Sequence, residues 1–317
     1  MSTTILEAVL CQADMGRPAA LCAIVATRGS TPQPAGAILC VDRDARITGT
    51  IGGGCVEAEV RRRAHELLVA GRSELLTFQL DHDFGYDDGL ICGGEMDVAI
   101  SIVDRAPQTE VLRSACETLR AGDEAMIPVR VQTARGLVEY RITIEASPEL
   151  LIAGAGHIGR ILARMAVPLG FRVCAIDDRG EYANAERFPP PIRPVVGDIA
   201  EILRTWPVGP NTYIVIVTRG HKHDEQALRA VLGKPTKYLG MIGSRRKIAV
   251  IFDDLRHAGV TPTELDRVHA PIGLKIGAVT PEEIAVSIAA ELVTVRRQSC
   301  RRAVEGPFPV SASGAIT

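Results

Sequence analysis

The part of the chain beyond residue 150 alternates short apolar strands with helical segments, and this alternation limits the possible folds more than any other feature. Apolar runs occur at residues 150–153, 172–176, 194–196, 213–217 and 238–242. Strands that alternate with helices at this spacing predict a doubly wound parallel sheet, because parallel neighbours need a crossover connection. We therefore expect a Rossmann-like domain of the α/β class here.

The first half of the chain has a different pattern, which predicts a separate and smaller domain of mixed α/β structure. A buried strand is expected at residues 19–27, a hairpin at 37–50, and one helical face through Val56–Leu68. The pattern changes at Ala146-Ser147-Pro148. The expected domains are therefore 1–147 and 148–298, followed by a flexible tail at 299–317, where periodicity is lost.

The parallel half opens with a glycine-rich turn, L-I-A-G-A-G-H-I-G-R. Gly154, Gly156 and Gly159 have the G-x-G-x-x-G spacing that lets a backbone approach a pyrophosphate at a helix N-terminus. The spacing alone is a weak signal, but here a strand precedes it and a helix follows. We expect a phosphate-bearing nucleotide or pterin at this turn, and the alternative is a turn kept for helix–strand packing alone.

Two further residues belong to this predicted cofactor site. Asp177 ends the second strand about 20 positions on, where an acidic side chain suits a pair of ribose hydroxyls. His157 occupies an x position of the turn. It either faces the ligand or caps the helix.

Two polar loops follow later strands, and in open α/β sheets ligands bind beyond the carboxyl ends of the strands. In T-R-G-H-K-H-D, Arg219 and His221 are candidate ligand contacts, and Asp224 is a candidate helix N-cap. His221 and His223 resemble a metal-binding pair, but no third ligand is evident, so solvated loop residues are the simpler interpretation.

The second loop, M-I-G-S-R-R-K, predicts a helix capped by Ser244 with Arg245 in its first turn. Cations at a helix N-terminus oppose the macrodipole, and an anionic ligand would offset that cost. Ser244 and Arg245 are therefore further cofactor-binding candidates, against the alternative of a solvated basic face.

In the first half, three glycines run directly into a cysteine and a helix: T-G-T-I-G-G-G-C-V-E. The amides of Gly52, Gly53 and Gly54 can form an anion-binding nest, and a thiol such as Cys55 at a helix N-terminus tends toward thiolate. A second stretch, G-L-I-C-G-G, places Cys92 in a similar setting. Both cysteines are candidate cofactor contacts and candidate metal ligands; the alternative for Cys55 is a small residue chosen for a tight turn.

Composition narrows the possible classes of protein. The formal net charge is −2, which gives no general attraction to nucleic acid or anionic membranes. The apolar runs are too short to span a bilayer, and the first residues lack a signal-peptide pattern, so we expect a cytoplasmic protein. Eight cysteines occur without a C-x-x-C pair, and Cys22, Cys40 and Cys174 in apolar runs are expected to be core residues.

Taken in order, these stretches resemble the XdhC/CoxI family, the accessory proteins of xanthine dehydrogenase and related molybdenum hydroxylases. The resemblance covers roughly Ile5 to Val295. It rests on seven motifs: G-S-T-P-Q-P-A-G, G-T-I-G-G-G-C-V-E, G-L-I-C-G-G, G-A-G-H-I-G, T-R-G-H-K-H-D, Y-L-G-M-I-G-S-R-R-K and A-P-I-G-L-K-I-G-A-V-T-P-E-E-I-A-V-S-I. Lys275 departs from the family pattern, in which an acidic residue is more usual.

The resemblance implies a small N-terminal domain joined to a Rossmann-type domain, and a homodimer. It implies binding of molybdenum cofactor, as molybdopterin or its cytosine dinucleotide form. It further implies that the cofactor is held while a cysteine desulfurase supplies a sulfido ligand, and is then passed to the apo-hydroxylase. Cys55 and Cys92 would then contact molybdenum or the labile sulfur.

Two other functions fit the same residues. An NAD(P)-dependent oxidoreductase would use the Rossmann turn, but no proton-transfer set for hydride chemistry stands out. A nucleotide-sensing regulator without catalysis would use the same turn. The sequence leaves open whether the protein is an enzyme, although a maturation chaperone is favoured over a catalyst.

Overall fold

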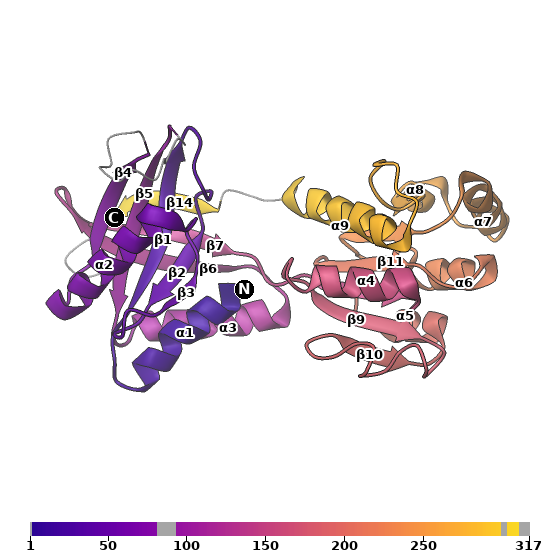
Figure 1. Ribbon diagram of the computed structural model, residues 1–317, viewed down its shortest axis with the longest axis horizontal. Coiled ribbons are helices and arrows are strands. Elements are labelled where there is room, and N and C mark those ends of the chain that lie inside the picture. The colour runs from indigo at the N-terminus through magenta and orange to yellow at the C-terminus, as the bar shows by residue number, and fades with distance from the viewer. Residues whose placement is uncertain (1, 81–92, 299–302, 311–317) are drawn as a thin grey trace. The chain divides into compact units, whose positions relative to one another are not determined.

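The computed structural model describes residues 2–80, 93–298 and 303–310, and the chain divides into two compact units. Unit 1 comprises residues 1–146 and 301–317, and unit 2 comprises residues 147–300. Figure 1 shows the helices and strands of each unit.

Unit 1 is built on an eight-stranded, largely antiparallel sheet in the order β14-β7-β6-β4-β5-β1-β2-β3. Its strands are β1 (Ala19–Arg28), β2 (Ile38–Val41), β3 (Ile47–Gly49), β4 (Glu74–Gln79), β5 (Glu95–Val103), β6 (Ala125–Thr133), β7 (Gly136–Ile144) and β14 (Val304–Pro309). Its helices are α1 (Ser2–Asp14), α2 (Gly54–Ala70) and α3 (Gln108–Ala121).

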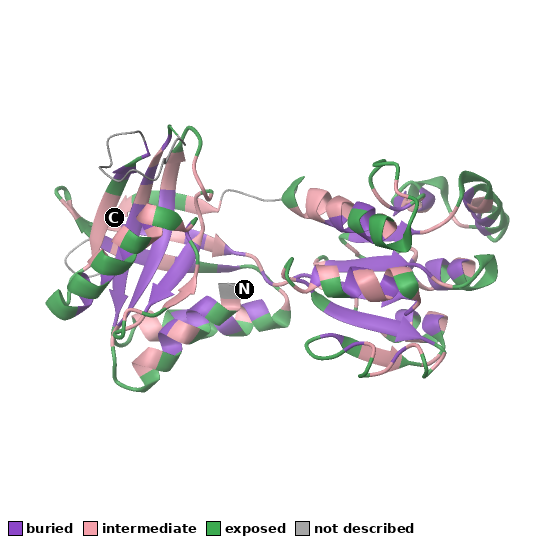
Figure 2. Cartoon of the chain, viewed as in Figure 1, coloured by how far each residue is buried: buried purple, intermediate pink, exposed green. Residues whose placement is uncertain are grey.

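Both faces of the unit 1 sheet are covered by helices. Side chains alternate along a strand, so those of β1 contribute to both faces. Leu21, Ala23 and Val25 pack with α1 and α3, whereas Cys22 and Ile24 pack with α2 on the opposite face. The two resulting cores are the buried regions of unit 1 in Figure 2. This arrangement fixes the first turn of α2 at one end of the sheet.

The C-terminal segment differs from the sequence prediction of a flexible tail. Residues 304–309 form β14, which pairs antiparallel with β7, so that Val304 lies opposite Ile142. The Arg141 guanidinium lies over the Phe308 ring, 4.9 Å from its centroid. The pattern was missed because a short strand paired at a sheet edge needs no long apolar period.

Unit 2 has a six-stranded parallel sheet in the order β10-β9-β8-β11-β12-β13. Its strands are β8 (Glu149–Ala153), β9 (Arg172–Asp177), β10 (Arg193–Val196), β11 (Thr212–Ile216), β12 (Tyr238–Met241) and β13 (Val268–His269). Its helices are α4 (His157–Ala166), α5 (Ile199–Thr205), α6 (His221–Val231), α7 (Arg245–His257), α8 (Pro262–Leu265) and α9 (Pro281–Gln298). The strand order is that of a Rossmann fold, so the predicted α/β class is confirmed.

The two faces of the parallel sheet carry separate cores. Helices α4 and α9 cover one face around Leu162, Tyr213 and Ile288, and α5, α6 and α7 cover the other around Leu203, Leu228 and Ile251. Strands buried on both faces are almost continuously apolar, as the sequence of β11 is.

Local signals set several helix ends, and the predicted cap at Ser244 is confirmed. Ser244 caps α7 by accepting a hydrogen bond from the Lys247 amide, and Thr280 and Glu283 form a capping box at the start of α9. Asp224 is not the cap of α6, because that helix begins at His221 after Gly220. Among the described residues, none of the helices is both long and apolar enough to cross a membrane.

Candidate functional site

The glycine turn of unit 2 uses its three glycines for different purposes. Gly154 has a φ of 114°, and a Cβ there would lie 2.4 Å from the Val217 carbonyl oxygen. A Cβ on Gly159 would lie 2.0 Å from the Gly154 carbonyl oxygen. At Gly156, the N-cap of α4, no atom lies within 4 Å of the Cβ position. Gly154 and Gly159 therefore permit close packing, and Gly156 leaves the helix N-terminus open to a ligand.

Asp177 lies against this turn, but it faces inward. The carboxylate is 2% exposed, and Oδ2 accepts a hydrogen bond of 2.9 Å from the Ala155 amide. The Arg179 amide and guanidinium also donate to it. Burial opposes ionisation of Asp177, but the Arg179 side chain and the two amides outweigh it and lower its pKa. These bonds hold the turn in shape, and a ribose contact at Asp177 stays a prediction.

The next residue, Asp178, is exposed and forms an ion pair with Arg219, at 2.7 Å from Nη2 to Oδ2. The pair joins the loop after β9 to the loop after β11, beside the glycine turn. His157 and His221 are both exposed first residues of helices, α4 and α6. The structure thus brings Arg219 to this edge of the sheet, but pairs it there with an acidic residue, Asp178.

A buried polar network joins the two polar loops of unit 2. Asp224 is fully buried and accepts hydrogen bonds from the Thr218 amide and hydroxyl, and it forms an ion pair with Lys247. This ties α6 to the first turn of α7. The sequence placed Asp224 at a helix cap, whereas the fold uses it to fix the loop after β11.

The start of α7 presents cations to solvent. Ser244 and Arg245 are exposed, as is Arg246, and within the described ranges neither arginine forms an ion pair with an acidic residue.

Arg160, in the first turn of α4, has a buried Nε for which the described residues supply no hydrogen-bond partner. Unit 2 has 20 lysines and arginines against 16 acidic residues, whereas unit 1 has 16 against 22. Unit 2 is thus the basic part of the chain.

The glycine turn of unit 1 differs in its backbone. Gly52, Gly53 and Gly54 have φ values of 123°, 73° and 64°, all in the region that favours glycine. A Cβ on Gly52 would lie 2.4 Å from the Pro32 Cβ, whereas Gly53 and Gly54 have open space around them. The run is required by conformation, and α2 starts at Gly54, so Cys55 lies in the first turn as expected.

The predicted anion nest of this turn is already filled by the chain itself. Oε2 of Glu57 accepts hydrogen bonds from the Ile51 and Gly53 amides, both at 3.2 Å, and from the Thr50 hydroxyl at 2.7 Å. In this conformation the Ile51 and Gly53 amides donate to Glu57, and cofactor binding by Gly52, Gly53 and Gly54 stays a prediction. The sequence signal was present, since Glu57 is the last residue of G-G-G-C-V-E.

Three loops that are far apart in the sequence meet at this end of the unit 1 sheet. Gly52 lies against Pro32, and a Cβ on Gly94 would lie 2.1 Å from the Ser30 carbonyl oxygen. We call residues 29–34, 50–55 and 93–94 the loop cluster. Cys92 precedes it directly but lies outside the described residues, so the prediction for Cys92 as a cofactor or metal contact stays a prediction.

The cysteines fall into two groups by exposure. Cys22, Cys40 and Cys174 are buried, as predicted, and burial raises the pKa of Cys40 and Cys174 to about 12. Cys55 is half-buried and Cys11 is exposed. Cys55 is therefore the accessible thiol of the loop cluster. Across the described ranges, no group of three or more His, Cys, Asp or Glu side chains is arranged to hold a metal ion.

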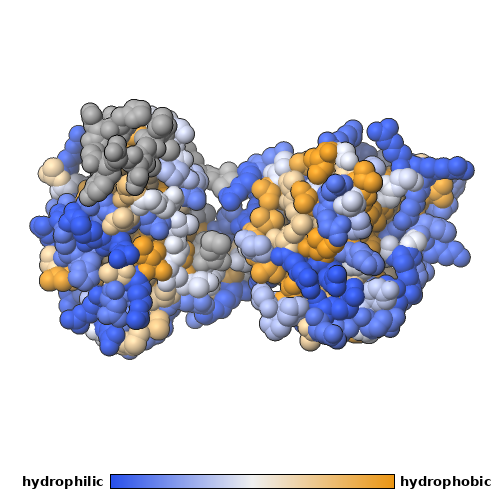
Figure 3. Space-filling model, in the orientation of Figure 1, coloured by the Kyte–Doolittle hydropathy of each residue, from blue (hydrophilic) through white to orange (hydrophobic). Residues whose placement is uncertain are grey.

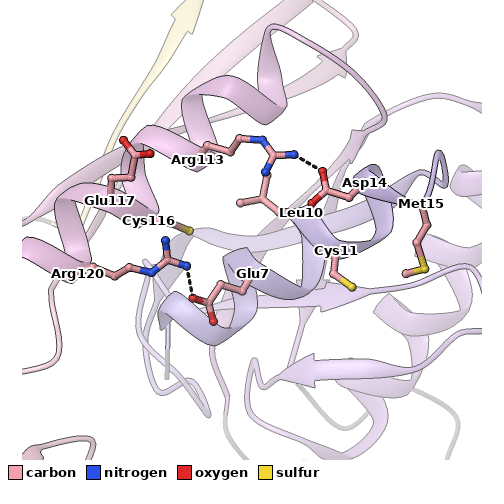
Figure 4. Close-up of a pocket in the computed structure, with 9 residues that line it drawn as sticks. All are labelled: Glu7, Leu10, Cys11, Asp14, Met15, Arg113, Cys116, Glu117 and Arg120. Atoms are coloured by element: carbon pink, nitrogen blue, oxygen red, sulfur yellow. Dashed lines mark hydrogen bonds and ion pairs between the residues drawn. The ribbon is translucent and has the colours of Figure 1, made fainter.

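A surface pocket of about 410 Å³ lies between α1 and α3, and none of the predicted site residues lines it (Figure 4). Ion pairs of Arg113 with Asp14 and of Arg120 with Glu7 cross between the two helices. Burial is the main cause of a raised pKa of Cys116, which lines the pocket. Because each arginine is neutralised by a carboxylate, the pocket has no excess of positive charge for the cofactor phosphate.

The surface of unit 2 also carries exposed apolar side chains next to α9. Leu274, Ile276 and Val279 lie in the loop before this helix, and Val286 lies within it; Val279 is 82% exposed. Hydrophobic residues among hydrophilic ones are visible on unit 2 in Figure 3. Such a patch is typical of an interaction surface.

Comparison with known proteins gives two family matches. Residues 150–292 match the XdhC Rossmann domain, and residues 12–79 match the XdhC and CoxI family. The two matched ranges correspond to the core of unit 2 and to the first half of unit 1.

Three curated relatives are similar to most of this chain. An uncharacterized Escherichia coli protein, YqeB, is 30% identical over 89% of this chain, which spans only 44% of its length. A Bacillus subtilis protein named as a probable xanthine dehydrogenase subunit is 24% identical, over 93% of this chain and 97% of that protein. The E. coli molybdenum cofactor insertion chaperone PaoD is 23% identical, over 89% of this chain and 84% of that protein.

A solved structure supports the fold. The crystal structure of a xanthine dehydrogenase from Bacillus halodurans matches with a TM-score of 0.78 and 22% identity, over 93% of this chain and 96% of that chain. At this identity the likeness establishes the architecture and not the activity.

Proposed function

Since the chain belongs to the XdhC and CoxI family, we propose that it binds molybdenum cofactor and delivers it to a hydroxylase of the xanthine dehydrogenase type. The names of two relatives, a cofactor insertion chaperone and a probable xanthine dehydrogenase subunit, support this class of function. The cofactor is a cargo of the protein in this proposal.

The loop cluster of unit 1 is the observation that carries the proposal. It gathers three of the family-like motifs around one accessible thiol, Cys55. Packing alone does not require a half-buried cysteine at this position, because the turn conformation depends on the glycines. A thiol beside glycine-rich backbone is suited to a soft metal or a labile sulfur.

The open turn of unit 2 fits a phosphate-bearing ligand. Molybdenum cofactor, when bound, presents a phosphate, a polar pterin and a dithiolene-chelated molybdenum. The bare backbone at Gly156 would receive a phosphate, and Arg245 would contribute a cation at the same edge of the sheet. The same turn suits the extra phosphate of a cytosine dinucleotide form.

The remaining parts of the proposal concern the bound cofactor before its delivery to the hydroxylase. We infer that the cofactor is held while a cysteine desulfurase supplies its sulfido ligand, and that Cys55, with Cys92, orients the metal during that step. A cytoplasmic homodimer is the form proposed to meet the apo-hydroxylase. The family membership supports these steps.

The proposal is tested by the ligand that co-purifies with the full chain from a molybdate-supplied host. We expect a pterin, detected as its fluorescent oxidation product, together with molybdenum by mass spectrometry. Cys55→Ser should lower the molybdenum content, and Cys11→Ser is the matched control because Cys11 is an exposed thiol outside the loop cluster. A chain free of pterin and molybdenum under these conditions would falsify the proposal.

The alternative, an NAD(P)-dependent oxidoreductase, is favoured by the Rossmann strand order and the open Gly156. It predicts saturable binding of NADH or NADPH, seen as a change in nicotinamide fluorescence, and turnover with a carbonyl substrate. Nucleotide binding without turnover or pterin would instead favour a regulator.

A further inference from the structure

The glycine turn before α2 is closed by a carboxylate of its own chain. A single oxygen, Oε2 of Glu57, accepts hydrogen bonds from Thr50, Ile51 and Gly53. The Thr50 hydroxyl in turn accepts a hydrogen bond of 3.1 Å from the Gly52 amide. Three successive amides of the turn are thus satisfied through Glu57 and Thr50, in the manner of an anion bound in a nest.

The turn needs such a constraint because the backbone of three successive glycines can adopt many conformations. Three successive glycines with positive φ lose more conformational entropy on ordering than any other residues would. Pro32 bounds the turn at Gly52, but added side chains at Gly53 and Gly54 would meet only open space. The hydrogen bonds to Glu57 are therefore the main restraint on the residues that lead into Cys55.

The charge of Glu57 is not balanced by a cation. In the part of the chain that the structure describes, no lysine or arginine forms an ion pair with it, although Glu59 and Glu66 on the same helix pair with Arg62. A negative charge held at this position disfavours the entry of a second anion. This distinguishes Glu57 from the surface carboxylates of α2.

We propose that Glu57 is a positioning residue that takes the place of an external anion in this turn and so fixes the Cys55 thiol within the loop cluster. The inference rests on the proposed function, in which Cys55 contacts the cargo. It goes further by assigning the Ile51 and Gly53 amides to Glu57, so that the cofactor's oxo or phosphate groups must be bound elsewhere.

The test uses the full chain and measures alkylation of Cys55 by iodoacetamide, resolved by mass spectrometry, at an alkaline pH where ionisation no longer limits the rate. Glu57→Ala should raise this limiting rate at least about threefold, because the freed turn exposes the half-buried thiol. Glu57→Gln keeps an acceptor oxygen and should stay within about twofold of the wild type. Glu59→Gln is the matched control, since Glu59 pairs with Arg62 on the same helix.

Chemical rescue makes the test specific for the proposed role. Formate at roughly 0.1 M should return the Glu57→Ala rate toward the wild-type value, whereas sodium chloride of equal ionic strength should not. If circular dichroism shows that Glu57→Ala is unfolded, Glu57→Asp takes its place, because its shorter side chain should also raise the rate. A Glu57→Ala or Glu57→Asp rate equal to that of the control overturns the proposal. So does an equal rise in Glu57→Gln, or a rise that formate does not reverse.

Failure of this inference and failure of the proposed function give different results. The alkylation assay needs no cofactor, so it reports on Glu57 even if the chain never binds a pterin. Conversely, a chain that co-purifies with the cofactor but alkylates Cys55 at the control rate in Glu57→Ala supports the function and rejects the positioning role.

Discussion

The two glycine turns look alike in sequence, since each leads from a strand or hairpin into a helix, but they are built differently. Of the three glycines in the unit 2 turn, only Gly154 has a positive φ, and Asp177 reaches the Ala155 amide from the next strand with its charge balanced by Arg179. In unit 1 all three glycines have positive φ, and Glu57 reaches back from the following helix without a cation.

This difference gives a criterion for recognising a turn that can bind a phosphate. A carboxylate paired with an arginine leaves the helix N-terminus attractive to anions, and Gly156 remains open there. A carboxylate without a cation fills the nest and repels a further anion. By this criterion we expect the turn of unit 2 to bind a phosphate and the turn of unit 1 to present a thiol.

The largest expected effect comes from Gly159→Ala in unit 2. The added Cβ would meet the Gly154 carbonyl at 2.0 Å, and relief requires a backbone shift that costs about 3 kcal/mol of unfolding free energy. Trp206 is the single tryptophan of the chain and lies in unit 2, so its fluorescence in urea reports this unit. Gly156→Ala is the matched control and should cost less than about 1 kcal/mol. Equal losses in the two variants would refute the separate roles of these glycines.

Asp177→Asn should have the next largest effect. It removes the buried charge that accepts hydrogen bonds from the Arg179 side chain and two amides, which costs about 2 kcal/mol at neutral pH. Because the folded pKa of Asp177 is lowered, its contribution is present above the unfolded value of about 3.9 and is lost as the pH falls through the folded value. The difference from the wild type in Trp206 urea titrations should therefore shrink below about pH 4. A difference that is independent of pH would contradict the ion-pair account.

Gly53→Ala tests the turn of unit 1 and should cost about 1 kcal/mol, the penalty for an alanine at positive φ with open space around it. The unfolding of unit 1 in urea is followed by alkylation of the buried Cys22. Trp206 fluorescence, which follows the unfolding of unit 2, should not change. A stability equal to that of the wild type would mean that the turn adopts another conformation.

The smallest effect is expected at the α1–α3 pocket. Arg113→Ala breaks the exposed ion pair with Asp14, which solvent and salt screen, so the urea midpoint followed by Cys22 alkylation should not change measurably. The reactivity of Cys55 should also stay the same. A clear change in either would show that this pocket is coupled to the loop cluster, which the comparison of the two turns does not require.

Local patterns were enough for most elements of the fold. The strand–helix alternation predicted the parallel sheet of unit 2, and the apolar face of Val56–Leu68 predicted α2, which the structure ends at Gly71 in the left-handed conformation. Ser244 was recognisable as a cap because a capping side chain bonds to an amide only a few residues away. Such signals need only neighbouring residues.

What the sequence determined by itself was therefore the family, the two kinds of architecture and the positions of the glycine turns. Only the tertiary structure decided that Asp177 faces inward against the turn of unit 2, that Asp224 is buried against Lys247, that β14 returns to pair with β7, and that three distant loops meet around Cys55. The physical reason is that these contacts depend on strand order and register. Residues far apart in the chain become neighbours only when the sheet has formed.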